Sequence, residues 1–94
     1  MARTNRNERL EELLANEIQL ILREEARDPA LNEVRVLAAT LSVDGRHARI
    51  AYAAPSERKD ELKRAAGFLR AQLASSLELK RTPELSFTFV GVSS

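Results

Sequence analysis

Asp44 and Gly45 stand between two strand-like runs, residues 34–43 and 46–53. An Asp-Gly pair in this setting is typical of a two-residue hairpin turn, because both central positions of that turn need positive φ. The facing pairs are then Leu41–Ala48, Ala39–Ile50 and Leu37–Tyr52 on an apolar side, and Thr40–Arg49 and Ser42–His47 on a polar side. This alternation predicts an antiparallel sheet that is covered on one face only.

Two further features concern the strands. Val34 and Val36 lie out of phase with Leu37, which predicts a bulge near the start of the first strand. Another strand is predicted over residues 85–89, where apolar Leu and Phe alternate with Ser and Thr. Pro83 precedes it, and the beginning of a strand is one of the few places in a sheet that tolerate proline.

Two longer segments carry apolar residues at the 3.6-residue spacing of amphipathic helices. The first covers residues 10–22, and an Asp-Pro pair beyond it ends the helix because proline disfavours helical geometry in the preceding residue. The second covers residues 62–77 and contains Gly67, while Phe68 lies about 240° around a straight helix from its first leucine, off the apolar stripe. We predict two helices joined at a kink that turns Phe68 toward the core. The alternative is one continuous helix with a tolerated glycine and a partly exposed phenylalanine.

These elements together predict one α+β domain over residues 1–94. Their order is helix, strand, strand, helix, kink, helix, strand, with the helices packed on one face of a three-stranded sheet. The 94 residues include only three Phe and one Tyr, and we assign all four to the core. Proteins that read single-stranded RNA stack bases on exposed aromatic side chains, so this assignment favours recognition of shape and phosphate.

The composition excludes several kinds of chemistry. The chain has no Cys and one His, which excludes disulfides and Cys-ligated metals and leaves little for acid–base catalysis near neutral pH. His47 beside Ser42 is interpreted as a polar cross-strand pair, because no glycine-rich nucleophile turn surrounds the serine. No apolar run reaches the roughly 20 residues of a membrane span, and none resembles a signal segment. We therefore expect a cytoplasmic, non-enzymatic protein with no metal or cofactor.

Charge is segregated along the chain, although the net charge is only +1. Residues 8–33 contain eight acidic and three basic residues, a net charge of −5, whereas residues 46–81 contain nine basic and four acidic residues, a net charge of +5. Such asymmetry is typical of a protein that turns one side toward a polyanion such as nucleic acid. The alternative is that these charges are solvated or paired within the molecule.

Four short motifs resemble the ribosome-binding factor A family. In chain order they are Asp28-Pro29-x-Leu31, Ser42-x-Asp44, Ala65-Ala66-Gly67-Phe68-Leu69-Arg70 and Arg81-x-Pro83-Glu84-Leu85-x-Phe87. The third resembles the Ala-x-Gly interhelical kink of that family, and the fourth resembles its approach to the final strand. Glu78 and Arg81 depart from the family pattern, which has a basic and an apolar residue there, and many members continue past the position of Ser94.

The resemblance implies a type II KH-like fold, in which the kink takes the place of the Gly-x-x-Gly loop of other KH domains. It implies binding to the free small (30S) ribosomal subunit during late assembly. It also implies support of 16S ribosomal RNA maturation near the 5′ end and a role in growth in the cold. The expected partners are 16S ribosomal RNA and neighbouring ribosomal proteins, bound by a monomer.

The predicted RNA-binding surface centres on Gly67. On a helical wheel, three cations lie along one edge beside this glycine: Lys59, Lys63 and Arg70. A phosphate could approach the backbone at the glycine while the cations neutralise its charge, and a second helix starting at the kink would add N–H donors. Further cations near strand ends are expected to extend the surface, namely Arg46, Arg49, Lys80 and Arg81. The kink itself is assigned to Ala65, Ala66 and Gly67.

Two other functions fit the same residues. One is a KH-like module that binds single-stranded RNA away from the ribosome. The other is a protein-interaction domain that uses the acidic first helix as its binding surface. Charge reversal at Lys63 and Arg70 separates the second alternative from both RNA-binding hypotheses, since only an RNA-binding protein should lose its partner.

Overall fold

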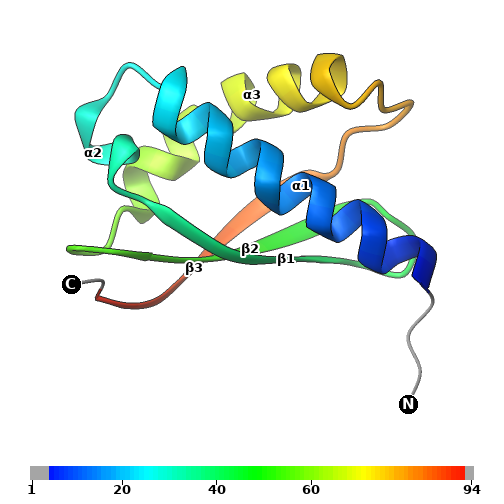
Figure 1. The fold of residues 1–94 in the computed structure, drawn as a ribbon, viewed down its shortest axis with the longest axis horizontal. Helices are drawn as coiled ribbons and strands as arrows, with labels where there is room; N and C mark the ends of the chain where they lie inside the picture. Colours follow the sequence, from blue (N-terminus) through cyan, green and yellow to red (C-terminus); the bar gives the residue numbers. More distant parts are fainter. Residues whose placement is uncertain (1–4, 93–94) are drawn as a thin grey trace.

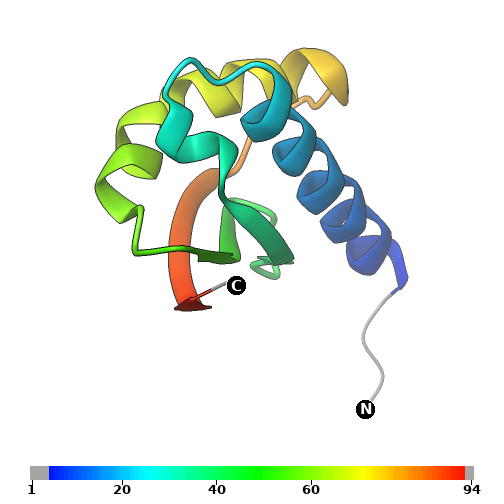
Figure 2. The ribbon, with the colours of Figure 1, turned by 60° about the vertical axis from the view of Figure 1, so that its left-hand side comes forward.

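The computed structural model describes residues 5–92 and shows two long helices on one face of a three-stranded sheet (Figures 1 and 2). The elements in chain order are α1 (Asn5–Glu24), α2 (Pro29–Asn32), β1 (Arg35–Leu41), β2 (His47–Ala54), α3 (Lys59–Ser76) and β3 (Glu84–Val92). This arrangement confirms the predicted α+β fold class. The one-turn helix α2 was not predicted; Asp28 accepts a hydrogen bond from the Ala30 amide at its start, and Pro29 occupies its first position.

The central strand β2 pairs differently with its two neighbours. It is antiparallel to β1 and parallel to β3. Parallel neighbours need a crossover connection, and α3 supplies it by returning the chain to the end of the sheet where β2 begins. The pairs Leu41–Ala48, Ala39–Ile50 and Thr40–Arg49 match the predicted register.

The predicted bulge is present and changes one predicted pair. The register between β1 and β2 shifts between Val36 and Ala38, so that Val36 faces Tyr52 where Leu37 was expected. Leu37 is the extra residue of the bulge and is half exposed.

The hairpin loop is wider than predicted. Asp44 Oδ1 accepts hydrogen bonds from Ser42 Oγ and from the Arg46 amide, at 2.7 and 3.0 Å. These bonds stabilise a turn in which Gly45, with φ of +73°, has positive φ and Asp44 does not. The Ser42 amide then donates to the His47 carbonyl, which closes a four-residue loop and replaces the two-residue turn.

The core lies between the helices and the covered face of the sheet. Its largest side chains with no more than about 2% exposure are Leu14, Ile18, Ile21, Leu22, Ile50, Tyr52, Leu62, Leu69 and Leu73. The Tyr52 and Phe89 rings are 5.4 Å apart, and Phe87 is buried beside the same core. Three of the four aromatic residues therefore occupy the core as predicted, and the fourth, Phe68, does not.

Helix α1 also protects the free edge of β1. The Leu41 amide donates to the buried Glu11 carboxylate at 2.7 Å, and the Val36 amide donates to Gln19 Oε1 at 2.8 Å. Gln19 Nε2 in turn donates to the Val34 carbonyl. Outward-facing strand amides that are satisfied in this way are not available for pairing with another chain.

Helix α3 corrects the prediction of two separate helices. It extends from Lys59 to Ser76 as a single helix, along a curved path, and no new helix begins at Gly67 (Figure 2). The leucines at 62, 69 and 73 are all buried, so one continuous stripe already supplies the contacts that anchor the helix. Glycine costs only about 1 kcal/mol relative to alanine within a helix, too little to break it. Phe68 consequently stays 42% exposed, as the alternative of a continuous helix predicts.

Candidate nucleic-acid interface

The first half of α3 presents Lys59, Lys63 and Gly67 to solvent. Lys59 and Lys63 are one helical turn apart, and within the described part of the chain neither lies within ion-pair distance of a carboxylate. A Cβ atom placed on Gly67 would meet no neighbouring part of the protein within 4 Å, so the backbone there faces open space. This edge can receive an anion. It lacks the N–H donors expected from a second helix start, because those amides are bonded within α3.

Arg70 has a structural contact that the sequence did not reveal. Its Nε donates to the Pro83 carbonyl and its Nη2 donates to the Thr82 carbonyl, both at 3.0 Å. Its Nη1 also lies 4.0 Å from the Glu84 carboxylate. The guanidinium therefore ties α3 to the segment that leads into β3 through two hydrogen bonds.

Three of the remaining predicted cations gather near the ends of α3 and of the hairpin. Lys80 and Arg81 are exposed in the segment before β3, and Arg46 is exposed before β2. The Glu84 amide donates to the Arg46 carbonyl at 2.8 Å, which brings these two segments together. Arg46 also lies 3.9 Å from Asp44, whose pKa is held below its usual value mainly by hydrogen bonds from Ser42 and the Arg46 amide.

Arg49 lies near the hairpin end of the sheet, three residues after Arg46. It is exposed on the sheet face that the helices leave open, where Thr40 and Ser86 flank it on the neighbouring strands. The predicted cations other than Arg70 thus form two groups: the α3 edge, and the region where β2 and β3 begin, with Arg49 on the open sheet face beside it.

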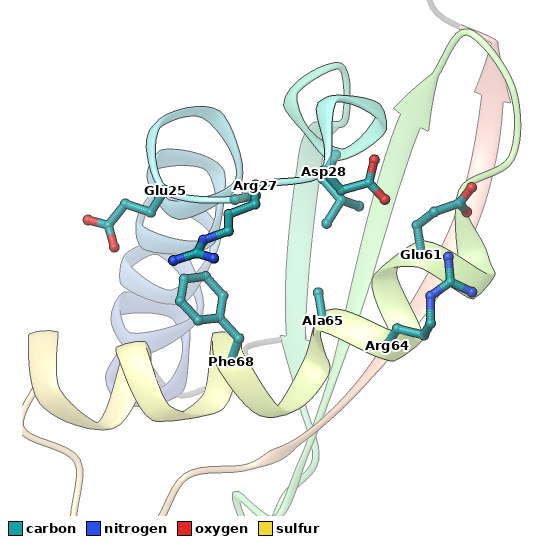
Figure 3. Close-up of a pocket in the computed structure, with 9 residues that line it drawn as sticks. Glu25, Arg27, Asp28, Glu61, Arg64, Ala65 and Phe68 are labelled. Carbon is teal, nitrogen blue, oxygen red and sulfur yellow. The ribbon is translucent and has the colours of Figure 1, made fainter.

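A cleft beside α3, next to its lysine-bearing edge, contains residues that the sequence analysis did not assign to a site. It has a volume of about 340 Å³ and lies between the α1–α2 connection and α3 (Figure 3). Its lining consists of Glu25, Ala26, Arg27, Asp28, Leu31, Glu61, Arg64, Ala65 and Phe68. The wheel position of Phe68 was the available sequence signal, since a straight helix leaves this ring outside the core. No comparable signal identified Arg27, which follows the end of α1.

Across residues 5–92, no group of three or more His, Asp or Glu side chains is placed to hold a metal ion. None of the helices in that range is long and apolar enough to span a bilayer.

The topology and the exposed glycine-containing edge of α3 define a small α+β domain of the KH-like class. A family model described as ribosome-binding factor A matches residues 6–89. The Heliobacterium modesticaldum ribosome-binding factor A is 37% identical over 88% of this chain and 74% of its own length. The Solibacter usitatus ribosome-binding factor A is 38% identical over 84% of this chain and 69% of its own length. The chain belongs to the ribosome-binding factor A family.

A crystal structure and a fitted homology model from this family have the same fold. The crystal structure of ribosome-binding factor A from Thermus thermophilus superposes with a TM-score of 0.79, at 29% identity, over 87% of this chain and 93% of the other. A homology model of the T. thermophilus protein, fitted into the cryo-EM map of a 30S–RbfA complex, gives a TM-score of 0.66 at 31% identity over 92% of each chain.

Proposed function

We propose that this protein binds the free small ribosomal subunit during late assembly and assists maturation of the 16S ribosomal RNA 5′ end. The observation that carries this proposal is the exposed α3 edge, where two lysines precede a glycine whose backbone faces open space, and neither lysine lies within ion-pair distance of a carboxylate among residues 5–92. Family membership supports the choice of partner, because the T. thermophilus relative has been placed in a 30S complex.

The α3 edge suits recognition of folded RNA through its backbone. Phosphates supply much of the affinity in protein–nucleic acid complexes, and each neutralised phosphate releases counterions. At Gly67 a phosphate can approach the helix without displacing a side chain, while Lys59 and Lys63 provide the positive charge. Binding should therefore weaken as the salt concentration rises.

The cations at the other end of the domain would form a second contact. Near the beginnings of β2 and β3 lie three cations, Arg46, Lys80 and Arg81. Lys59 is the first residue of the 18-residue helix α3, and the segment with Lys80 and Arg81 follows the other end of that helix. At 1.5 Å per residue, that helix spans roughly 27 Å. A surface with two basic ends fits a large RNA with fixed geometry better than a short flexible strand, and Arg70 serves chiefly to hold the two ends in place.

Charge reversal at Lys63 tests this proposal. The variant Lys63→Glu should bind purified small subunits roughly tenfold more weakly at moderate salt, since one phosphate contact is lost. The control is Arg9→Glu, an equal change of charge at an exposed position of α1. In cells that depend on the variant, 16S ribosomal RNA with an unprocessed 5′ end should accumulate, most of all in the cold. Equal loss of binding in both variants would remove the α3 edge from the site.

A further inference from the structure

We propose that the cleft beside Phe68 receives one unstacked base of single-stranded ribosomal RNA that carries an exocyclic amino group. The proposal rests on the function given above and adds a base-binding site to the phosphate-binding edge of α3. It rests on three observations: a half-exposed aromatic ring, guanidinium groups from two different elements, and carboxylates at the rim.

The Phe68 ring has the exposure and the surroundings of a stacking platform. It is 42% exposed and forms no part of the buried core. Leu31, Ala26 and Ala65 give the cleft an apolar floor. An aromatic face of this kind binds the flat face of a base, and the cleft volume of about 340 Å³ accommodates a group of that size.

Two arginines line the same cleft from different segments. Figure 3 shows the Arg27 side chain reaching from the α1–α2 connection toward the Phe68 ring, and Arg64 lies on α3 one turn before that ring. Guanidinium planes stack on bases as well as attracting phosphates. Arg64 and Phe68 lie next to Gly67 and Lys63 around the outside of α3, so an RNA strand that crosses at the glycine can insert a base here.

The carboxylates decide which base fits. Glu25, Asp28 and Glu61 outnumber the two arginines, so the cleft repels phosphate and favours a neutral group that donates hydrogen bonds. Adenine, cytosine and guanine carry exocyclic amino groups from which carboxylates can accept hydrogen bonds, whereas uracil has none. A Lys-rich peptide is the other occupant that this charge would suit. We favour the base because an exposed aromatic ring with the Arg27 guanidinium beside it provides a surface for stacking.

The test uses the absence of tryptophan from the chain. In Phe68→Trp, the sole tryptophan reports directly on the cleft. Oligoadenylate should quench its fluorescence more strongly than oligouridylate, and an abasic oligonucleotide of equal length should have little effect. Equal quenching by the abasic strand would overturn the proposal, as would a response to a Lys-rich peptide with none to oligoadenylate.

A second arm uses small subunits and Phe68→Leu, which keeps an apolar side chain but removes the ring. Stacking contributes enough that this variant should bind about tenfold more weakly than wild type while unfolding at the same temperature. Undiminished binding by Phe68→Leu would overturn the base site and leave the proposed function intact. Failure of the wild type to bind small subunits would instead contradict the proposed function. The oligonucleotide experiment would still show whether the cleft binds a base.

Discussion

Replacing Gly67 by alanine should stabilise the domain. The glycine lies within a continuous helix, and an added methyl group meets no neighbouring part of the protein within 4 Å. Alanine is favoured over glycine by roughly 0.8–1.0 kcal/mol in such a position, because glycine loses more backbone entropy on folding. For a domain of this size, that difference raises the melting temperature by roughly 4–8 °C.

The matched control is Ala71→Gly, at an exposed position one turn further along α3. Thermal unfolding followed by circular dichroism should show a rise for Gly67→Ala and a comparable fall for Ala71→Gly. A fall for both variants would show that residue 67 adopts a conformation that only glycine tolerates, which would refute the continuous helix. Because the new methyl group occupies the space left for a phosphate, Gly67→Ala should also bind small subunits more weakly despite its higher stability.

Three further predictions concern stability and its coupling to binding. Glu78 has a φ of +53°, where the helix-ending residue is usually glycine, so Glu78→Gly should raise the free energy of unfolding by about 1 kcal/mol in urea titrations. Burial raises the pKa of the Tyr52 phenol above 10.0, so its contribution to stability is fully present below pH 10 and is lost as the pH rises through the folded-state pKa. Wild type should therefore lose stability above pH 10 more steeply than Tyr52→Phe, and parallel curves would contradict this. Arg70→Gln should cost roughly 1–2 kcal/mol of stability, because two carbonyls lose their donor, yet it should weaken subunit binding less than Lys63→Glu.

The sequence predicted the parts of the fold that depend on short-range periodicity. Alternation placed Ala39 opposite Ile50, and the phase change before Leu37 predicted the bulge. The prediction of a two-residue hairpin turn was wrong. Hydrogen bonds from Ser42 and Arg46 to Asp44 stabilise a wider loop, and the general preference of Asp-Gly pairs for tight turns takes no account of these bonds. The prediction of two helices was wrong because it assumed that Phe68 must be buried, whereas its ring is 42% exposed on one continuous helix.

The candidate site was harder to predict because it depends on contacts between distant segments. A helical wheel places Arg70 beside Lys63 but cannot show that the carbonyls of residues 82 and 83 bind its guanidinium. The cleft forms only when the α1–α2 connection packs near α3, which brings Arg27 to Phe68 across about forty positions of the chain. Sequence patterns within one helix carry no information about either arrangement.

The most direct test of the central claim is the affinity of the wild-type protein for purified small subunits, large subunits and an unstructured RNA at two salt concentrations. The account predicts tight binding to small subunits, much weaker binding to the other two, and a loss of affinity at the higher salt concentration. Equal affinity for the unstructured RNA would contradict it and would indicate an RNA-binding module that is not specific for the ribosome.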